Sequence, residues 1–190
     1  MNRGDFILKC PGSGMDWIRI RLLYRFSFPA SERKPFRIIR RMYADGKADV
    51  ICAYESGAFV GFYSTINGER LVLLDYLAVR KKKRSCGAGS HMLSHFQSAY
   101  PEQGVFVEIE NAFEDCKNRE ERLRRRNFYI KNGMKPMNVL ACVFGVNMEL
   151  LGTGAQIDFE TYRSFYRDNY SEFAAKNIVE AAVPQGLSVG

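Results

Sequence analysis

The stretch from Leu71 to Leu93 combines residue types that could bind phosphate groups. An apolar run, LVLLDYLAV, is followed by the basic, glycine-bearing segment RKKKRSCGAG and then by SHML, which begins a helical pattern. A helix start leaves backbone N–H groups unpaired and carries partial positive charge, and glycine lets a backbone approach a phosphate closely. The spacing Arg84-x-x-Gly87-x-Gly89 therefore predicts a phosphate cradle between a strand and a helix.

The same segment has other interpretations, because a run of cations is most often a solvated surface and can also bind nucleic acid. RKKKR (80–84) and RLRRR (122–126) hold much of the net charge of +7, which indicates anionic partners without choosing among them. The segment is neither a P-loop nor a dinucleotide fingerprint, because no Gly-Lys-Ser/Thr follows and the third glycine of GxGxxG is missing. No spacing of His or Asp marks Cys86 as a nucleophile, so it is interpreted as a small loop residue.

The strand, glycine turn and helix together resemble the acetyl-CoA site of the GNAT N-acetyltransferase superfamily, in which this turn wraps the pyrophosphate of coenzyme A. The resemblance implies acetyl-CoA as cosubstrate, and it implies that backbone groups at the end of the strand bind pantetheine. We expect no metal, because His91 and His95 lack the acidic partner of an HExxH pattern. The cofactor-binding residues that the resemblance implies are Leu77, Ala78, Val79, Arg84, Ser85, Cys86, Gly87, Ala88, Gly89 and Ser90.

A second group of candidate residues lies on the predicted strand 104–110, GVFVEIE. Alternation places Glu108 and Glu110 on one face together with Phe106. Two carboxylates on one face could bind a cationic amine and accept its proton, or they could simply lie in water at a strand end. The resemblance implies a glutamate of this strand at the acceptor site, and we rank the candidate bases as Glu108, then Glu110, then Asp75.

Downstream, Phe128-Tyr129-x-x-x-Gly133-Met134 resembles the FYxxxGF signature of the second GNAT motif. In many members of the family this tyrosine protonates the thiolate that leaves coenzyme A, so the resemblance assigns that role to Tyr129. Two positions depart from the pattern, because Arg122 and Arg125 stand where the family commonly has Asn and Ala. From the residues alone, Phe128 and Tyr129 could equally be helix core.

The chain of 190 residues, with 46% hydrophobic content, is long enough for one well-cored domain. We predict a single α/β domain over 1–190 with the GNAT acyl-CoA N-acyltransferase fold: a mixed, mostly antiparallel central sheet flanked by helices. Its core spans about 6–151, and a C-terminal helical extension covers about 155–182. Hydrophobic periodicity and turn signals predict strands near 6–10, 48–56, 58–66, 70–79, 104–110 and in two runs within 137–151, and helices near 16–28, 35–46, 90–101, 119–133 and 158–173. Asp16 and Asp158 are the predicted N-caps of the first and last of these helices, and Asn67-Gly68 and Gly145 mark turns between strands. The end of the chain, 181–190, is interpreted as a frayed tail.

Five widely spaced cysteines without a CxxC pair argue for a reducing compartment and against a disulfide framework. We find neither a signal-peptide core near the N-terminus nor an apolar run long enough to span a bilayer. We therefore expect a cytoplasmic protein that does not bind membranes.

Together these patterns predict transfer of an acetyl group from acetyl-CoA to a primary amine by direct attack. The acidic candidates suggest a cationic acceptor, which could be a small molecule or a peptide, and an acyl group longer than acetyl stays open. The alternative is a non-catalytic acyl-CoA or nucleic-acid binding module on the same fold, although we do not expect nucleic acid as the partner. The aromatic face at 158–173 could pack on its own domain, form a homodimer contact or cover a pocket.

Overall fold

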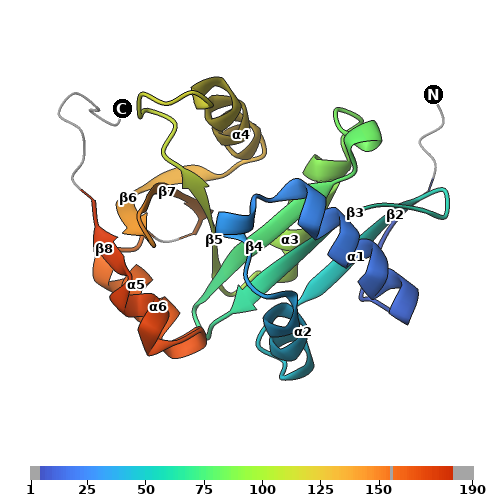
Figure 1. The fold of residues 1–190 in the computed structure, drawn as a ribbon, viewed down its shortest axis with the longest axis horizontal. Helices are drawn as coiled ribbons and strands as arrows, with labels where there is room; N and C mark the ends of the chain where they lie inside the picture. The colour runs from blue at the N-terminus through green and yellow to red at the C-terminus, as the bar shows by residue number, and fades with distance from the viewer. Residues whose placement is uncertain (1–4, 155, 182–190) are drawn as a thin grey trace. The chain divides into compact units, whose positions relative to one another are not determined.

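A computed structural model describes residues 5–154 and 156–181 (Figure 1). Its elements confirm the type of every strand and helix predicted up to residue 153. None of the helices in this described part combines the length and the apolar character needed to cross a bilayer. In chain order the elements are β1 (Phe6–Lys9), α1 (Gly14–Ser27), the 3₁₀ turn η1 (Ala30–Glu32), α2 (Phe36–Ala44), β2 (Val50–Glu55), β3 (Ala58–Asn67), β4 (Leu71–Val79), the 3₁₀ turn η2 (Lys81–Lys83), α3 (Ala88–Ala99), β5 (Gly104–Glu110), α4 (Arg119–Lys131), β6 (Lys135–Val143), β7 (Val146–Thr153), α5 (Phe159–Asn169), α6 (Glu172–Lys176) and β8 (Ile178–Glu180).

The strands form one sheet whose hydrogen-bonded neighbours follow the order β1-β2-β3-β4-β5-β7-β6-β8. The pairs β1–β2, β2–β3, β5–β7, β6–β7 and β6–β8 are antiparallel. β4 and β5 pair in parallel, over Leu71–Leu73 and Gly104–Phe106. This is the mixed, mostly antiparallel α/β sheet that the sequence predicted.

Two compact units divide the described chain, one from residues 5–67 and 74–99 and the other from 68–73, 100–154 and 156–181. The first unit contains β1 to β3, the second part of β4, and α1 to α3. The second contains the first three residues of β4, then β5 to β8 and α4 to α6. The single domain over 1–190 stays a prediction.

In the first unit, helices cover both faces of the sheet (Figure 1). Phe62 of β3 lies in a core cluster with Ile20 and Tyr24 of α1. The next residue, Tyr63, points to the other face and packs its ring edge-on against Phe96 of α3, with 6.0 Å between ring centroids. Because both faces are covered, β2 and β3 are buried along almost their whole length instead of alternating between buried and exposed residues.

Gly61 of β3 allows α3 to pack closely against this sheet. A Cβ built on Gly61 would lie 2.5 Å from the carbonyl oxygen of Ala78 on β4 and 3.0 Å from Cε of Met92 on α3. The contact with the Ala78 backbone is closer than real Cβ atoms come, so a larger residue would force β4 to move, and the tight contact would also displace the end of the Met92 side chain. Since β4 and α3 flank the glycine loop, this close packing also positions that loop.

In the second unit, α5 packs against the face of β5 that carries Phe106. The Phe106 ring lies 5.1 Å from that of Phe165 and 6.1 Å from that of Tyr162, in edge-on contacts. Tyr162 also contacts Glu108, two residues along the strand. Phe106 and Glu108 therefore share a face, as the alternation of the sequence predicted.

The predicted start of the first helix is wrong. The N-cap is Ser13, whose hydroxyl accepts from the backbone N–H of Asp16, and the helix already begins at Gly14. Asp16 lies inside the first turn, is buried, and accepts hydrogen bonds from the Tyr54 hydroxyl and the Gly12 backbone. The Tyr54 bond lowers the pKa of Asp16 despite its burial. The Asp16 carboxylate therefore joins α1 to β2 instead of capping the helix.

The predicted C-terminal helical extension over about 155–182 is also wrong in part. Its N-cap, Asp158, is confirmed by a hydrogen bond from the Thr161 backbone, but α5 ends at Asn169. The chain then forms the short helix α6 and the strand β8, which pairs with β6. Phe173 consequently leaves the aromatic face and is 70% exposed. Of the frayed tail predicted over 181–190, Ala181 donates its backbone N–H to the Leu140 carbonyl at 3.0 Å, and 182–190 lie outside the described residues.

Candidate functional site

The basic segment after β4 contacts the start of β3 and the end of β2. The Arg80 backbone N–H donates to the carbonyl of Val60 at 2.8 Å, which continues the sheet by one residue. The Lys83 ammonium then forms an ion pair with Glu55 at the end of β2, at 2.7 Å. The neighbouring Lys81 and Lys82 are exposed. These contacts of Arg80 and Lys83 hold the basic segment beside the start of α3.

Gly87 sets the conformation of the loop at the point where the helix begins. Its φ of +87° lies in the left-handed region that favours glycine, and Ser85 has a φ of +63°. The Gly87 carbonyl accepts from the His91 backbone at 3.0 Å, so Gly87 occupies the N-cap position of α3. At a helix start with this N-cap, the backbone N–H groups of Ala88, Gly89 and Ser90 have no acceptor within the helix.

One detail of the predicted cradle changes. The sequence predicted a turn over residues 84–89 with the helix behind it, but α3 already begins at Ala88. Gly89 consequently lies in the first helical turn, and only Gly87 of the two glycines has positive φ. Arg84 is exposed, and the N–H groups of the first turn of α3 have no acceptor within the helix. Both suit a pyrophosphate group, because helix starts and guanidinium groups favour anions.

The two histidines of α3 have partners in the first unit. Nδ1 of His95 lies 2.8 Å from the hydroxyl of Tyr63. The ring of His91 lies 4.9 Å from that of Phe6 on β1. Within the described residues, no group of three or more His, Cys, Asp or Glu side chains could hold a metal ion. The two histidines therefore connect α3 to β3 and β1.

Asp75, the third candidate base, lies beside a lysine of the first unit. The Lys34 ammonium contacts its carboxylate at 2.7 Å, and the two side chains are 19% and 11% exposed. Lys34 is itself held by tyrosines, because its carbonyl accepts from Tyr24 at 2.9 Å and its N–H donates to Tyr76 at 3.2 Å. The Asp75 charge is therefore balanced by a cation in a fixed position.

Glu108, the first candidate base, is held by two tyrosine hydroxyls in the second unit. Tyr162 and Tyr166 of α5 both donate to its Oε1, at 2.6 and 2.7 Å. Burial, followed by the neighbouring Glu108 charge, raises the pKa of Tyr162 well above its usual range. Tyr162 is therefore a protonated donor at neutral pH, and α5 fixes the orientation of the carboxylate.

Glu110, the second candidate base, is held by two arginines of α4. Arg122 and Arg125 contact its two oxygens at 2.8 and 3.1 Å. Arg122 also contacts Glu114 at 3.0 Å and has a side chain only 11% exposed. These are the two positions at which the sequence departs from the GNAT pattern. Their long side chains pair with a strand carboxylate where the family commonly has Asn and Ala.

Tyr129 is the buried residue of α4. Burial raises the pKa of Tyr129 to about 12, although the nearby Arg125 opposes part of that rise. The phenol is therefore protonated at neutral pH and can donate a hydrogen bond. Full transfer of its proton to an ordinary thiolate, whose conjugate thiol has a pKa of about 8.5, would be unfavourable by roughly 3.5 pK units in this environment.

The structure thus groups the predicted residues by unit. Leu77 to Val79 and Arg84 to Ser90 adjoin one another in the first unit, where Asp75 is also found. Glu108, Glu110 and Tyr129 belong to the second unit. Sequence analysis missed that five side chains hold the three carboxylates. The tyrosines among them gave a signal as part of the aromatic face at 158–173, and the arginines gave one as departures from the GNAT pattern. Those side chains are Lys34, Tyr162, Tyr166, Arg122 and Arg125.

Comparisons with known proteins were made by sequence and by structure. No protein-family model matches the sequence, and no curated protein matches it. Among solved structures, a GNAT-family protein from Bacteroides thetaiotaomicron aligns over 90% of this chain and 98% of its own, with a TM-score of 0.70 and 18% identity. The chain has the GNAT fold.

Two further solved structures with this fold are also similar to the chain. An aminoglycoside 6'-N-acetyltransferase complexed with coenzyme A aligns over 80% of this chain and 99% of its own, with a TM-score of 0.63 and 14% identity. Arabidopsis thaliana Naa50, in complex with the bisubstrate analogue CoA-Ac-MVNAL, aligns over 79% and 99%, with a TM-score of 0.60 and 16% identity. The GNAT fold predicted from the glycine loop is confirmed, and at these identities the likeness concerns the fold alone.

Proposed function

We propose that the chain is an N-acetyltransferase that moves an acetyl group from acetyl-CoA to a primary amine. The observation that carries the proposal is the start of α3 on a GNAT fold, where Gly87 in the left-handed region leads into three backbone donors that have no acceptor within the helix. A pyrophosphate carries two negative charges close together, and a helix start offers several N–H groups that converge on one point. Arg84 adds a guanidinium at the same place.

The residues that would hold acetyl-CoA divide between the loop and the strand before it. Ser85, Cys86 and the first turn of α3 would bind the pyrophosphate, and the exposed cations of residues 80–84 would meet the ribose phosphate. The backbone of Leu77 to Val79 would bind pantetheine, and an N–H near Val79 would stabilise the oxyanion of the reaction. Acetyl-CoA supplies the thioester carbonyl that the amine attacks.

Glu108 is the base that we propose for the amine. An alkyl amine is protonated at neutral pH and must lose that proton before its nitrogen can form a bond to the thioester carbon. Glu110 and Asp75 already contact cations at 2.8 and 2.7 Å. Glu108 accepts from the hydroxyls of Tyr162 and Tyr166, which orient its carboxylate to bind an ammonium and take its proton, directly or through water.

Tyr129 is the donor that we propose for the departing sulfur. When the carbon–sulfur bond breaks, the thiolate needs a hydrogen-bond donor and finally a proton. A buried phenol with a pKa of about 12 holds its proton at neutral pH and stabilises the thiolate first as a hydrogen-bond donor.

The acceptor that we propose is a cationic amine, carried either by a small molecule or by a peptide N-terminus. The compartment that we propose is the reducing cytoplasm. Negative Glu108 favours a cationic substrate by charge alone. The alternative, a module that binds acyl-CoA or nucleic acid without turnover, predicts binding without thiol release. The nucleic-acid form has less support, because Arg122, Arg125 and Arg126 form ion pairs with strand carboxylates.

The test is thiol release from acetyl-CoA across a panel of amines, including polyamines, aminoglycosides, amino acids and peptides, with thermal-shift binding of acetyl-CoA measured in parallel. Release with one class of amine would establish the activity and name the acceptor class. Binding without release from any of them would contradict the transfer reaction and leave a sensor. Absence of binding would contradict the role assigned to Arg84–Gly89.

A further inference from the structure

The outer face of α1 carries an apolar stripe that is exposed. Met15, Ile18, Leu22 and Phe26 follow at spacings of three and four residues, and they are 53%, 52%, 52% and 82% exposed. The opposite face of the same helix is buried in the core of the first unit. A surface helix ordinarily has one apolar face and one polar face. A second apolar face therefore indicates a surface that contacts another molecule.

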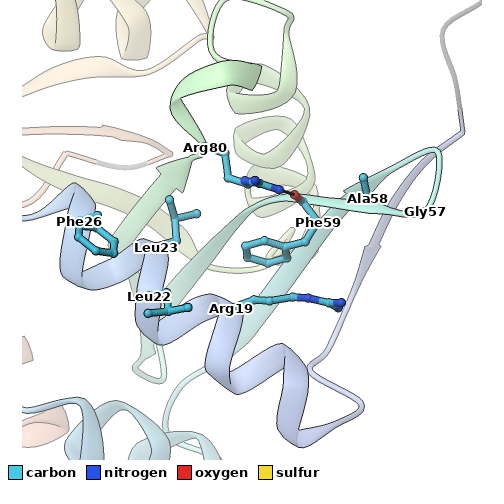
Figure 2. A pocket seen from close by; sticks show the side chains of 8 residues that line it. All are labelled: Arg19, Leu22, Leu23, Phe26, Gly57, Ala58, Phe59 and Arg80. Carbon is cyan, nitrogen blue, oxygen red and sulfur yellow. Dashed lines mark hydrogen bonds between the residues drawn. The ribbon is translucent and has the colours of Figure 1, made fainter.

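The stripe borders a hollow in the surface of the first unit (Figure 2). This cavity has a volume of about 490 Å³ and lies between α1, the turn from β2 to β3, and the residue that follows β4. Buried Phe59 forms part of its wall. Its lining residues are Arg19, Leu22, Leu23, Phe26, Gly57, Ala58, Phe59 and Arg80. The hollow is large enough for a bulky apolar side chain.

Arginines border both the stripe and the hollow. At 100° per residue, Arg19 lies along one side of the stripe and Arg21 and Arg25 lie along the other, and all three are exposed. Arg80 lines the hollow, where one of its nitrogens donates to the Phe59 carbonyl at 3.2 Å. Arg19 also forms an ion pair with Asp16 at 3.3 Å. The rim is therefore cationic around an apolar centre.

We propose that this surface binds an acidic amphipathic segment of another protein. One bulky apolar side chain of that segment fills the hollow beside Phe59, its other apolar residues cover the stripe, and its carboxylates pair with the arginine rim. Charge complementarity favours this occupant over a second copy of the chain, which would bring arginines against arginines. An anionic bilayer would suit the charge but, being flat, would leave the hollow unfilled.

The test is selection of phage-displayed random peptides, about 16 residues long or roughly four helical turns, on the immobilised full chain. Selected peptides are synthesised with a fluorophore, and their affinity is measured by polarisation. The variants are Phe26→Ser, which removes apolar surface, and the pair Arg21→Glu with Arg25→Glu, which reverses the rim charge without disturbing the Arg19 contacts. Phe173→Ser is the matched control, because Phe173 is 70% exposed in the other unit.

The expected result is enrichment of Asp and Glu with aromatic or aliphatic residues at spacings of three and four. Affinity should fall at least about tenfold in Phe26→Ser and in the double arginine variant, and it should not change in Phe173→Ser. The proposal is overturned by an absence of selected binders, by peptides without acidic residues, or by binding that the α1 variants leave intact. It is equally overturned if Phe26→Ser instead abolishes self-association in sedimentation, or flotation with phosphatidylserine vesicles.

Discussion

The two basic segments of the chain are alike in sequence and different in structure. Residues 80–84 form a loop on the first unit in which Lys81, Lys82 and Arg84 are exposed. In residues 122–126 of α4, by contrast, arginines point at strand carboxylates: Arg122 pairs with Glu110 at 2.8 Å and Arg126 with Glu149 at 2.8 Å. In the first segment Lys83 pairs with Glu55, and the charges of Lys81, Lys82 and Arg84 stay exposed to solvent. In the second segment most of the arginines hold the helix to the sheet. A run of cations therefore predicts a binding surface only to the extent that the fold leaves its charges without acidic partners.

The largest effect is expected from replacing Gly87, the glycine that follows the first segment at the start of α3. Gly87→Val should abolish acetyl-CoA binding, because valine disfavours a φ of +87° and its side chain would obstruct the approach of the pyrophosphate. We expect a loss of at least about 100-fold in affinity, measured by calorimetry. The matched control is Gly46→Val, at a φ of +70° after α2, where nothing lies within 4 Å. Wild-type affinity in Gly87→Val would contradict the cofactor assignment.

The second segment lies on the helix that also carries the proposed donor to sulfur. Tyr129→Phe should leave acetyl-CoA binding unchanged while turnover falls by roughly 10- to 10,000-fold at neutral pH. Thermal shift measures the binding and thiol release measures the turnover. Full activity in this variant would exclude Tyr129 from the mechanism and leave α4 with a structural role alone.

Removing a paired arginine from the second segment should affect folding more than cofactor binding. Arg122→Ala leaves Glu110 with only one arginine, in a site where both side chains of the lost pair are 11% exposed. We expect the free energy of unfolding in urea to fall by about 2–3 kcal/mol, somewhat less than for a fully broken buried pair. Arg124→Ala, at 73% exposure on the same helix, should change it by less than about 0.5 kcal/mol. An equal loss of unfolding free energy in the two variants would show that the buried ion pair contributes no more to stability than the exposed arginine does.

Removing an exposed arginine from the first segment should have the opposite profile. Arg84→Ala should weaken acetyl-CoA binding by about tenfold, with little change in the free energy of unfolding, because its charge faces solvent until the phosphates arrive. Titrations at two salt concentrations should show a smaller salt dependence than in the wild type, since one phosphate contact is lost. An unchanged salt dependence would place the pyrophosphate elsewhere.

The smallest effect concerns pH. Burial raises the pKa of Tyr129 to about 12 in the folded protein, above the ordinary value of 10.0 for a tyrosine, so the buried phenol favours its protonated form. Its contribution to stability is complete below pH 10 and is lost only as the pH rises through about 12. Turnover should therefore not fall between about pH 9 and about pH 11 through loss of this proton. A descending limb in that range that disappears in Tyr129→Phe would contradict the raised pKa.

Much of the fold follows from local patterns. The Asn67-Gly68 and Phe144-Gly145 turns, the alternation of 104–110 and the glycine after 119–132 each mark an element within a few residues of its observed end. The errors lie where an interaction with a residue distant in sequence overrode the local pattern. Ser13 rather than Asp16 caps α1, because Tyr54, 38 residues away, binds the aspartate. The C-terminal helix breaks at Tyr170–Ser171, and the following residues pair with β6 as a strand.

The strand, the glycine turn and the helix start can be predicted from the sequence, because all three lie within 23 consecutive residues and depend on backbone conformation and local charge. The contacts of each carboxylate, by contrast, depend on the tertiary fold. Glu108 meets Tyr162 across 54 residues of chain and Asp75 meets Lys34 across 41. A side chain's partner at such separations depends on which helix packs on which strand. Three acidic residues that look alike in sequence therefore end beside two hydroxyls, two guanidinium groups and one ammonium.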